Sequence, residues 1–386
     1  MLAVYVIAVF LVVAGGGWLV FDLDLLPIGV HAPNPVVGAR ATRRPVTRVA
    51  QSVAKGPEDN LIAIPAYDIG ERTFQPSPLP LSLPVACDPG VDCWIFNYVD
   101  VDPGTARADF ACGQMSYDTH KGTDIALAHE GRLADEVAVL AAATGLVIGV
   151  RDGMVDANIR LAGRASVKDR ECGNGVRLDH GGGWYTQYCH LKHNSVNVKT
   201  GDRVRNGDRI GSVGLSGLTE FPHLHLGVEK DGKVVDPFVG ISGGERCQIG
   251  KAPLWRPEVL ERLRYLSAVP YNIGFTDRIP DIMDIRSGKA DNTVLSSKSS
   301  ALVFWVEVAG LRPKDYLSVR LFGPDGVLLA RKEETIERYQ IRVWRAIGKK
   351  SKTGWPPGTY RGEVAIIRET ATGPMEARRS ARVDVF

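Results

Sequence analysis

The chain has 386 residues, of which 44% are hydrophobic and 24% are charged. These values are ordinary for a globular protein, and the length allows two or three domains. The net charge of +3 is too small to indicate nucleic-acid binding, so we expect no nucleic-acid partner. The six cysteines are an even number without a Cys-x-x-Cys pair, which suits an oxidising compartment.

The N-terminal segment is apolar. Residues 1–20 contain no charged side chain, since the first is Asp22. A run of this length is near what spans a bilayer as a helix, and it also fits the apolar part of a secretory signal. The usual positive start of such a signal is missing, because the first basic residue is Arg40. We therefore expect residues 1–23 to be a signal or an inner-membrane anchor, and the protein to be exported to the periplasm or cell envelope.

Prolines dominate the next segment. Residues 24–86 contain many prolines and few periodic apolar runs, so they predict a linker or extended arm. Residues 87–250 predict the first folded domain. Short β-branched runs such as Gly145–Val150 alternate there with glycine turns. The run Val137–Ala143 fits a strand or a helix by its pattern alone. Few other runs have helical spacing, which favours an antiparallel sheet.

Two cysteine pairs can be argued from their placement. Cys172 and Cys189 are equidistant from the His180-Gly181 junction, where a turn is expected. In a hairpin they would lie opposite each other, at a Cα separation close to what a disulfide requires. Cys87 and Cys93 bracket a turn sequence and could close a small loop. The sequence leaves the remaining connectivity open.

A helical connector is predicted over residues 251–289. Its clearest helix is Pro257–Arg264, with apolar residues three and four apart and proline at the start. Residues 290–386 then show strand patterns at regular spacing. Leu302–Val308 alternates, and Leu317–Phe322 precedes a Gly-Pro-Asp-Gly hairpin turn. About six such strands predict a small immunoglobulin-like β-sandwich. The predicted fold class is thus mainly β, with an antiparallel sheet domain before the sandwich.

Metal-ligating residues gather in two short motifs. One is His120-Lys-Gly-Thr-Asp124, and the other is His223-Leu-His225. Zinc binds histidine nitrogen and aspartate oxygen, and catalytic zinc sites keep three protein ligands and one open position. Residues two apart in a strand face the same side, so His223 and His225 would face one groove. Gly122 permits a bend that turns His120 and Asp124 toward one ion.

A further histidine segment, Tyr188-Cys-His190-Leu191, lies between these two motifs. With it, the chain resembles the lysostaphin-type zinc endopeptidases, which cut the peptides of bacterial peptidoglycan. The resemblance covers roughly residues 110–240, and one departure is Glu220-Phe221, where the family usually has small residues. The other matching segments are Gly173–Gly181, Gly201–Gly211 and Pro222–His225.

The resemblance implies a role for each of five residues. His120, Asp124 and His225 would be the zinc ligands. His190 and His223 would orient or deprotonate the attacking water and stabilise the oxyanion. No HExxH segment is present, so a glutamate base of that type is not expected.

Three further residues match the family pattern or lie near it. His180 is expected to make local hydrogen bonds near the turn. Asn174 is expected to line the groove. Tyr188 could line the groove or pack in the core, and the sequence leaves this open.

The leading hypothesis is an exported zinc-dependent endopeptidase that hydrolyses peptide bonds in peptidoglycan cross-links. The bond would join D-alanine to a diamino acid, with a glycyl bridge as the alternative, and the sandwich would assist placement rather than chemistry. A second hypothesis is a non-catalytic envelope adaptor that activates other cell-wall hydrolases, but all five site residues are present. A third is a sugar phosphocarrier, which the apolar N-terminus, Asp124 and the cysteines disfavour. The oligomeric state is left open.

Overall fold

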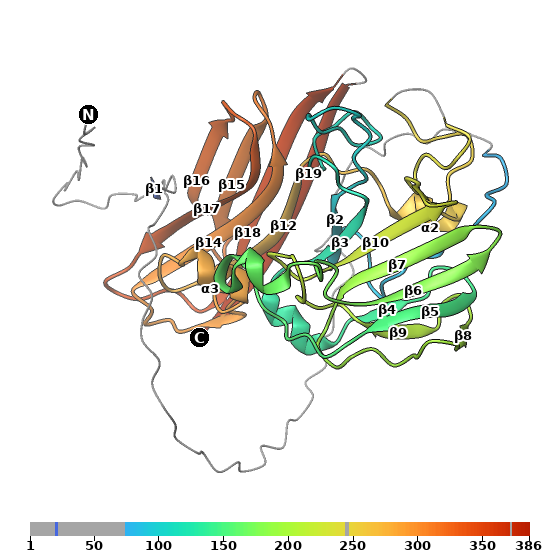
Figure 1. Ribbon diagram of the computed structural model, residues 1–386. Helices are drawn as coiled ribbons and strands as arrows, with labels where there is room; N and C mark the ends of the chain where they lie inside the picture. The colour runs from blue at the N-terminus through green and yellow to red at the C-terminus, as the bar shows by residue number, and fades with distance from the viewer. Residues whose placement is uncertain (1–19, 22–73, 244–246, 371–372) are drawn as a thin grey trace, which may run out of the picture.

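The computed structural model describes residues 20–21, 74–243, 247–370 and 373–386. The expected signal or anchor segment and most of the proline-rich linker lie outside these ranges. Among the described residues, no helix is both long and apolar enough to cross a membrane. This part of the chain is mainly β, as predicted, and its sheets are almost entirely antiparallel (Figure 1).

An eight-stranded sheet carries the histidine motifs. Seven of its strands run in the order β2-β3-β10-β7-β6-β5-β8, and β11 pairs with β10. A two-stranded sheet of β4 and β9 lies near it in Figure 1. The bounds are β2 Cys93–Asn97, β3 Gly122–Leu127, β4 Ala138–Leu140, β5 Gly145–Arg151, β6 Asn174–Gly181, β7 Trp184–Leu191, β8 Arg203–Val204, β9 Arg209–Ser212, β10 His223–Lys230 and β11 Lys233–Val234. The short helices here are η1 Glu130–Asp135, α1 Ile159–Ala162 and η2 Arg164–Val167.

Alternation along β10 decides which side of the sheet carries the site. Leu224, Leu226 and Val228 belong to the main hydrophobic core. Because successive side chains of a strand point to opposite faces, His223 and His225 lie on the other face. The core therefore fixes the register of β10, and the register places both histidines together.

The C-terminal part is a sandwich of two sheets. One has the order β1-β17-β14-β12 and the other has the order β13-β19-β18-β15-β16. Their apolar faces enclose a second core that includes Phe304, Val319 and Ile366. The bounds are β1 Val20–Phe21, β12 Val269–Thr276, β13 Val294–Leu295, β14 Ala301–Leu311, β15 Tyr316–Phe322, β16 Leu328–Thr335, β17 Gln340–Lys350, β18 Gly358–Thr370 and β19 Gly373–Val385.

The predicted helical connector, 251–289, is wrong in its middle. It contains α2 Pro257–Arg262, the predicted helix, and α3 Ile282–Ser287, but β12 lies between them. Every residue of β12 is buried. Ile273 and Phe275 belong to the sandwich core, whereas Val269 and Tyr271 pack against β2. A strand buried on both faces lacks the alternation by which a strand is recognised in a sequence.

Three disulfides connect all six cysteines. The predicted Cys172–Cys189 bridge is confirmed, with its Cα atoms 4.8 Å apart. The Cys87–Cys93 loop is confirmed as well. The third bridge joins Cys112 to Cys247, which are 135 residues apart. Sequence reasoning offered no argument for this pair, because only the folded chain brings the two residues together.

Candidate metal centre

Adjacent strands bring the motif residues together. His225 of β10 lies directly across from Asp124 of β3 and from Cys189 of β7. His120 lies just before β3, and His190 follows Cys189 in β7. The five residues predicted from the sequence therefore gather around the centre of the eight-stranded sheet.

Three donor atoms lie within reach of one ion. His120 Nε2 is 3.1 Å from Asp124 Oδ1 and 3.1 Å from His225 Nδ1, and the latter two atoms are 2.8 Å apart. His120 and Asp124 are each only 2% exposed. Two imidazoles and a carboxylate are the ligand types of catalytic zinc sites. Among the described residues, no Lys or Arg side chain pairs with the three groups, and a buried cluster of this kind fits a divalent metal ion.

Contacts behind the triad orient its donor atoms. The Nδ1 of His120 donates to the Tyr98 carbonyl at 2.7 Å, which leaves Nε2 with its lone pair for a metal. Asn97 Nδ2 donates to Asp124 Oδ2 at 2.8 Å, so Oδ1 faces the histidines. Such contacts fix the tautomer and orientation of metal ligands. Sequence reasoning missed Asn97 and Tyr98, which lie in or next to the apolar strand β2 and belong to no motif.

Gly122 has a different role from the expected one. It lies in β3 rather than in a bend. A Cβ atom at this position would come within 2.6 Å of the His225 imidazole and within 2.7 Å of the Leu226 carbonyl. Glycine is therefore required for the close approach of β3 and β10 at the triad.

His190 and His223 lie beside the triad, with ring centroids 4.7 Å apart. His190 Nδ1 donates to the Ser216 carbonyl at 2.8 Å. His223 Nδ1 donates to the Phe221 carbonyl at 2.9 Å, and His223 Nε2 is 3.5 Å from Asp124 Oδ1. In both rings Nδ1 is the hydrogen-bond donor, so the neutral form has its lone pair on Nε2. Each ring can therefore accept a proton at Nε2, and in His223 this atom faces Asp124.

The charges of this cluster shift its pKa values. Burial alone would raise the pKa of Asp124, but His120 and His223 hold that pKa well below its usual value. Burial lowers the pKa of His120, yet the attraction of Asp124 raises it overall. Burial, together with repulsion from His223 and His225, lowers the pKa of His190 well below its usual value. Asp124 is thus ionised and His190 neutral at neutral pH, the protonation states that a metal ligand and a proton acceptor need.

The backbone at His190 is in the left-handed region, with φ of 61°. This conformation costs free energy in a residue other than glycine, and such residues cluster at active sites. The disulfide at Cys189 adjoins it, and His190 N donates to the carbonyl of Cys172 at 2.8 Å. The bridge and this hydrogen bond together hold the strained backbone of β7 that presents the imidazole.

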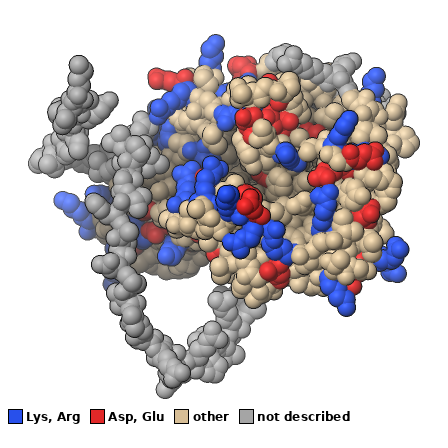
Figure 2. Space-filling view, viewed as in Figure 1, with Lys and Arg blue, Asp and Glu red and all other residues tan. Residues whose placement is uncertain are grey.

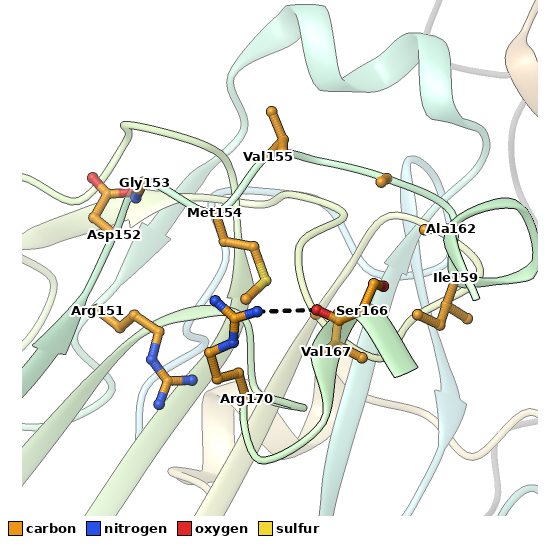
Figure 3. A pocket seen from close by; sticks show the side chains of 12 residues that line it. Arg151, Asp152, Gly153, Met154, Val155, Ile159, Ala162, Ser166, Val167 and Arg170 are labelled. Atoms are coloured by element: carbon orange, nitrogen blue, oxygen red, sulfur yellow. Dashed lines mark hydrogen bonds between the residues drawn. The ribbon is translucent and has the colours of Figure 1, made fainter. Parts of the chain in front are cut away.

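A pocket of about 530 Å³ is drawn in Figure 3, and its lining approaches the site in the sequence at Gly217. Gly217 is part of its lining. In the sequence this glycine lies between Ser216 and Thr219, which contact His190 and His223. Thr219 Oγ1 is 3.1 Å from His223 Nδ1, and Ser216 accepts from His190. The other lining residues are Arg151, Asp152, Gly153, Met154, Val155, Ala157, Ile159, Ala162, Ser166, Val167 and Arg170.

On the face drawn in Figure 2, Lys and Arg side chains gather near the centre, with Asp and Glu among them.

The groove expectation was wrong for Asn174. This residue is fully buried, and its amide bonds to the backbone of Met154 and Leu191. Tyr188 is also fully buried, and its hydroxyl accepts from Ala142 N at 2.8 Å, so it packs in the core. His180 makes the expected local hydrogen bonds, with the Thr144 carbonyl and Thr186 Oγ1.

The part of the chain around this site matches a known family model. The match is to peptidase family M23 and runs over residues 118–237. These residues form a peptidase M23 domain. The family is that of the lysostaphin-type peptidases, which the motifs had indicated. The domain includes β3, β10 and all five site residues, whereas the sandwich lies outside the match.

Relatives of the M23 domain include metalloproteases and peptidoglycan enzymes. An "Uncharacterized metalloprotease" of Haemophilus influenzae is 34% identical over 121 residues, 30% of this chain and 24% of the relative. The "Peptidoglycan DD-endopeptidase ShyC" of Vibrio cholerae is 38% identical over 69 residues, 17% of this chain and 16% of the relative. The "DD-carboxypeptidase/endopeptidase Mpg" of Neisseria meningitidis is 37% identical over 81 residues, 21% and 18% of the two chains. The chain thus spans less than a quarter of each of these relatives.

A comparison with solved structures also finds the catalytic domain of lysostaphin from Staphylococcus simulans. It is 22% identical, with a TM-score of 0.24, and the match covers 37% of this chain and 86% of that chain.

Proposed function

We propose that this protein is an exported, zinc-dependent endopeptidase that hydrolyses peptide bonds in peptidoglycan cross-links. The observation that carries the proposal is the buried His120–Asp124–His225 triad with His190 and His223 beside it. An M23 domain and relatives named as peptidoglycan endopeptidases support the substrate class.

Zinc bound at the triad would supply Lewis-acid chemistry, activating a water molecule and polarising the scissile carbonyl. The imidazoles of His190 and His223 would accept the proton of the attacking water at Nε2. Once protonated, each can donate at the same atom, either to the oxyanion or to the leaving amine. The Ser216 and Phe221 carbonyls keep both rings in the required tautomer.

The bond we propose joins D-alanine to the diamino acid of a neighbouring stem peptide. The relatives named as DD-endopeptidases favour this bond over a glycyl bridge. A non-catalytic adaptor remains the competing function, but such a protein needs no complete set of ligands and proton acceptors. Here the five groups also lie at distances that suit joint action.

The deciding experiment digests isolated sacculi with the full chain, with chelator, and with chelator followed by added zinc. We expect mass spectrometry to show cross-linked dimers converted to monomers while glycan strands stay uncut. Chelator should abolish this conversion and zinc should restore it. Release of glycan fragments with intact peptides would contradict the proposal. If the chain leaves sacculi unchanged but stimulates a second hydrolase, the adaptor is correct.

A further inference from the structure

The aromatic residue that departs from the family pattern lies directly against a proposed catalytic group. The ring of Phe221 stacks on the ring of His223, with centroids 4.5 Å apart and planes 28° apart. The Phe221 carbonyl also accepts the Nδ1 hydrogen of His223 at 2.9 Å. One residue therefore sets both the plane and the tautomer of this imidazole.

Phe221 also contacts the C-terminal sandwich. The guanidinium carbon of Arg342, from β17, lies 5.4 Å from the centroid of the Phe221 ring, within the range of a cation–π contact. Phe221 also packs beside Phe96 of β2, at 5.3 Å, and Phe96 meets Tyr271 of β12 edge-on at 4.6 Å. The ring thus fills the junction between the M23 domain and the sandwich.

Buried polar contacts hold Arg342 in place. Its Nε donates to the Tyr271 hydroxyl at 3.0 Å, and its second amino group donates to Glu307 at 3.2 Å. Glu307 of β14 is fully buried and also pairs with Arg286 at 2.9 Å. A buried carboxylate with two guanidinium partners constrains both of them, because any displacement leaves a charge unpaired. Arg342 therefore presents a rigid sandwich surface to Phe221.

We propose that the C-terminal sandwich positions His223 through the Arg342–Phe221 contact. Phe221 and Arg342 are positioning residues, since neither is placed to touch the reacting atoms. Through these contacts the sandwich restricts the His223 imidazole to the orientation needed for proton transfer. This inference rests on the proposed peptidase function, and it assigns to the sandwich a task within the site in addition to any contact with substrate.

The test compares Phe221→Leu with Phe221→Tyr. Leucine keeps most of the bulk but removes the stack, whereas tyrosine keeps the aromatic face. A displacement of a catalytic group of about 1 Å can cost about 10²-fold in rate. We expect Phe221→Leu to lose about ten- to a hundredfold in kcat with unchanged KM and zinc content, and Phe221→Tyr to recover most of the loss. Arg342→Ala should follow Phe221→Leu. The matched control Arg320→Ala, on the exposed side of β15, should retain wild-type kcat.

A second readout does not depend on activity. Nitrogen NMR of the histidine rings reports the tautomer, and the wild-type His223 should carry its proton on Nδ1. We expect Phe221→Leu and Arg342→Ala to shift or broaden the His223 ring signals, because the imidazole plane loses its stacking support. The proton should stay on Nδ1, since the backbone carbonyl of residue 221 remains as its acceptor, and Phe221→Tyr should restore the wild-type signals. Wild-type kcat and an unchanged His223 signal in folded Phe221→Leu would overturn the inference. Because the NMR result stands without turnover, it distinguishes a failure of this inference from a failure of the proposed peptidase function.

Discussion

The triad illustrates how a buried carboxylate can remain charged. Asp124 is almost fully buried, and its ionised form would be costly without partners. His120, His223 and His225 lie around Oδ1, while Asn97 donates to Oδ2. A metal ion at the same place would supply the positive charge permanently, which explains why the cluster is built from groups that bind metals in their deprotonated forms.

The first prediction concerns metal content. We expect wild-type protein to bind one zinc ion per chain and His120→Ala to lose it, because two remaining protein ligands would not hold the ion tightly. Elemental analysis of the purified proteins measures this directly. His129→Ala is the control, since His129 is not among the contacts of the triad, and it should keep its zinc. Full zinc content in His120→Ala would remove this residue from the ligand set.

The second prediction separates proton transfer from metal binding. His190→Ala and His223→Ala should each retain zinc and lose about 10²–10⁴-fold in activity, the usual contribution of a positioned acid or base. Metal analysis and digestion of sacculi are performed on the same preparations. Either variant acting at the wild-type rate would show that its histidine is not catalytic.

The third prediction concerns a buried carboxyl group near the core of the M23 domain. Burial, with the charge of Asp109 nearby, raises the pKa of Asp236 from 3.8 to about 7. The folded state therefore binds this proton more tightly than the unfolded state between about pH 4 and pH 7. Asp236 favours folding below this window, and the benefit is lost as the pH rises through it.

Asp236→Asn removes this titration and resembles the protonated side chain. The free energy of unfolding of wild type, relative to that of Asp236→Asn, should fall by a few kcal/mol as the pH rises from about 4 to 7. Urea unfolding at a series of pH values measures the difference. A constant difference across this range would mean that Asp236 keeps an ordinary pKa in the folded protein.

At the scale of elements, what the sequence could predict depended on which faces of a strand are buried. β10 is apolar on one face only, and the rule that residues two apart in a strand share a face placed His223 and His225 on one side. β12 is buried on both faces and was missed. The Cys172–Cys189 bridge followed from symmetry about a local turn, whereas Cys112–Cys247 depends on tertiary folding. The proposed ligands were recognisable from their motifs, whereas the contacts of Asn97, Tyr98 and Phe221 with the site are visible only in the fold.

The fourth prediction tests the Cys172–Cys189 bridge as a support for His190. Replacing both cysteines by serine should cost about 2–5 kcal/mol in the free energy of unfolding. It should also lower kcat, because the strained backbone at His190 loses its covalent anchor. The matched control replaces Cys87 and Cys93, which close a small loop outside the metal centre. That variant should lose stability without a fall in kcat, and equal kcat values for the two variants would show that the bridge has no role at the site.

At the scale of the whole molecule, the sandwich and the eight-stranded sheet that carries the site share a buried junction. Trp94 and Phe96 of β2 form one apolar cluster with Val269, Tyr271 and Ala309 of the sandwich. Arg379 of β19 lies over the Trp94 ring at 4.7 Å and donates to the Val91 carbonyl at 3.3 Å. Figure 1 shows the sandwich, in orange and red, beside the teal strands β2 and β3. Such a junction should transmit stability from one part to the other.

The last prediction follows from this coupling. Wild-type protein should unfold in a single calorimetric transition, because separating the two parts would expose the aromatic cluster and leave the polar contacts of Arg379 unmet. Trp94→Ala should cost about 3–5 kcal/mol, the usual range for truncating a buried tryptophan, and should split the transition into two. Trp355 is also buried but belongs to the sandwich core alone. Trp355→Ala should therefore lower the temperature of a transition that remains single. Two transitions already present in wild-type protein would show that the junction is too weak to couple the parts, and the positioning of His223 by the sandwich would then require another source of rigidity.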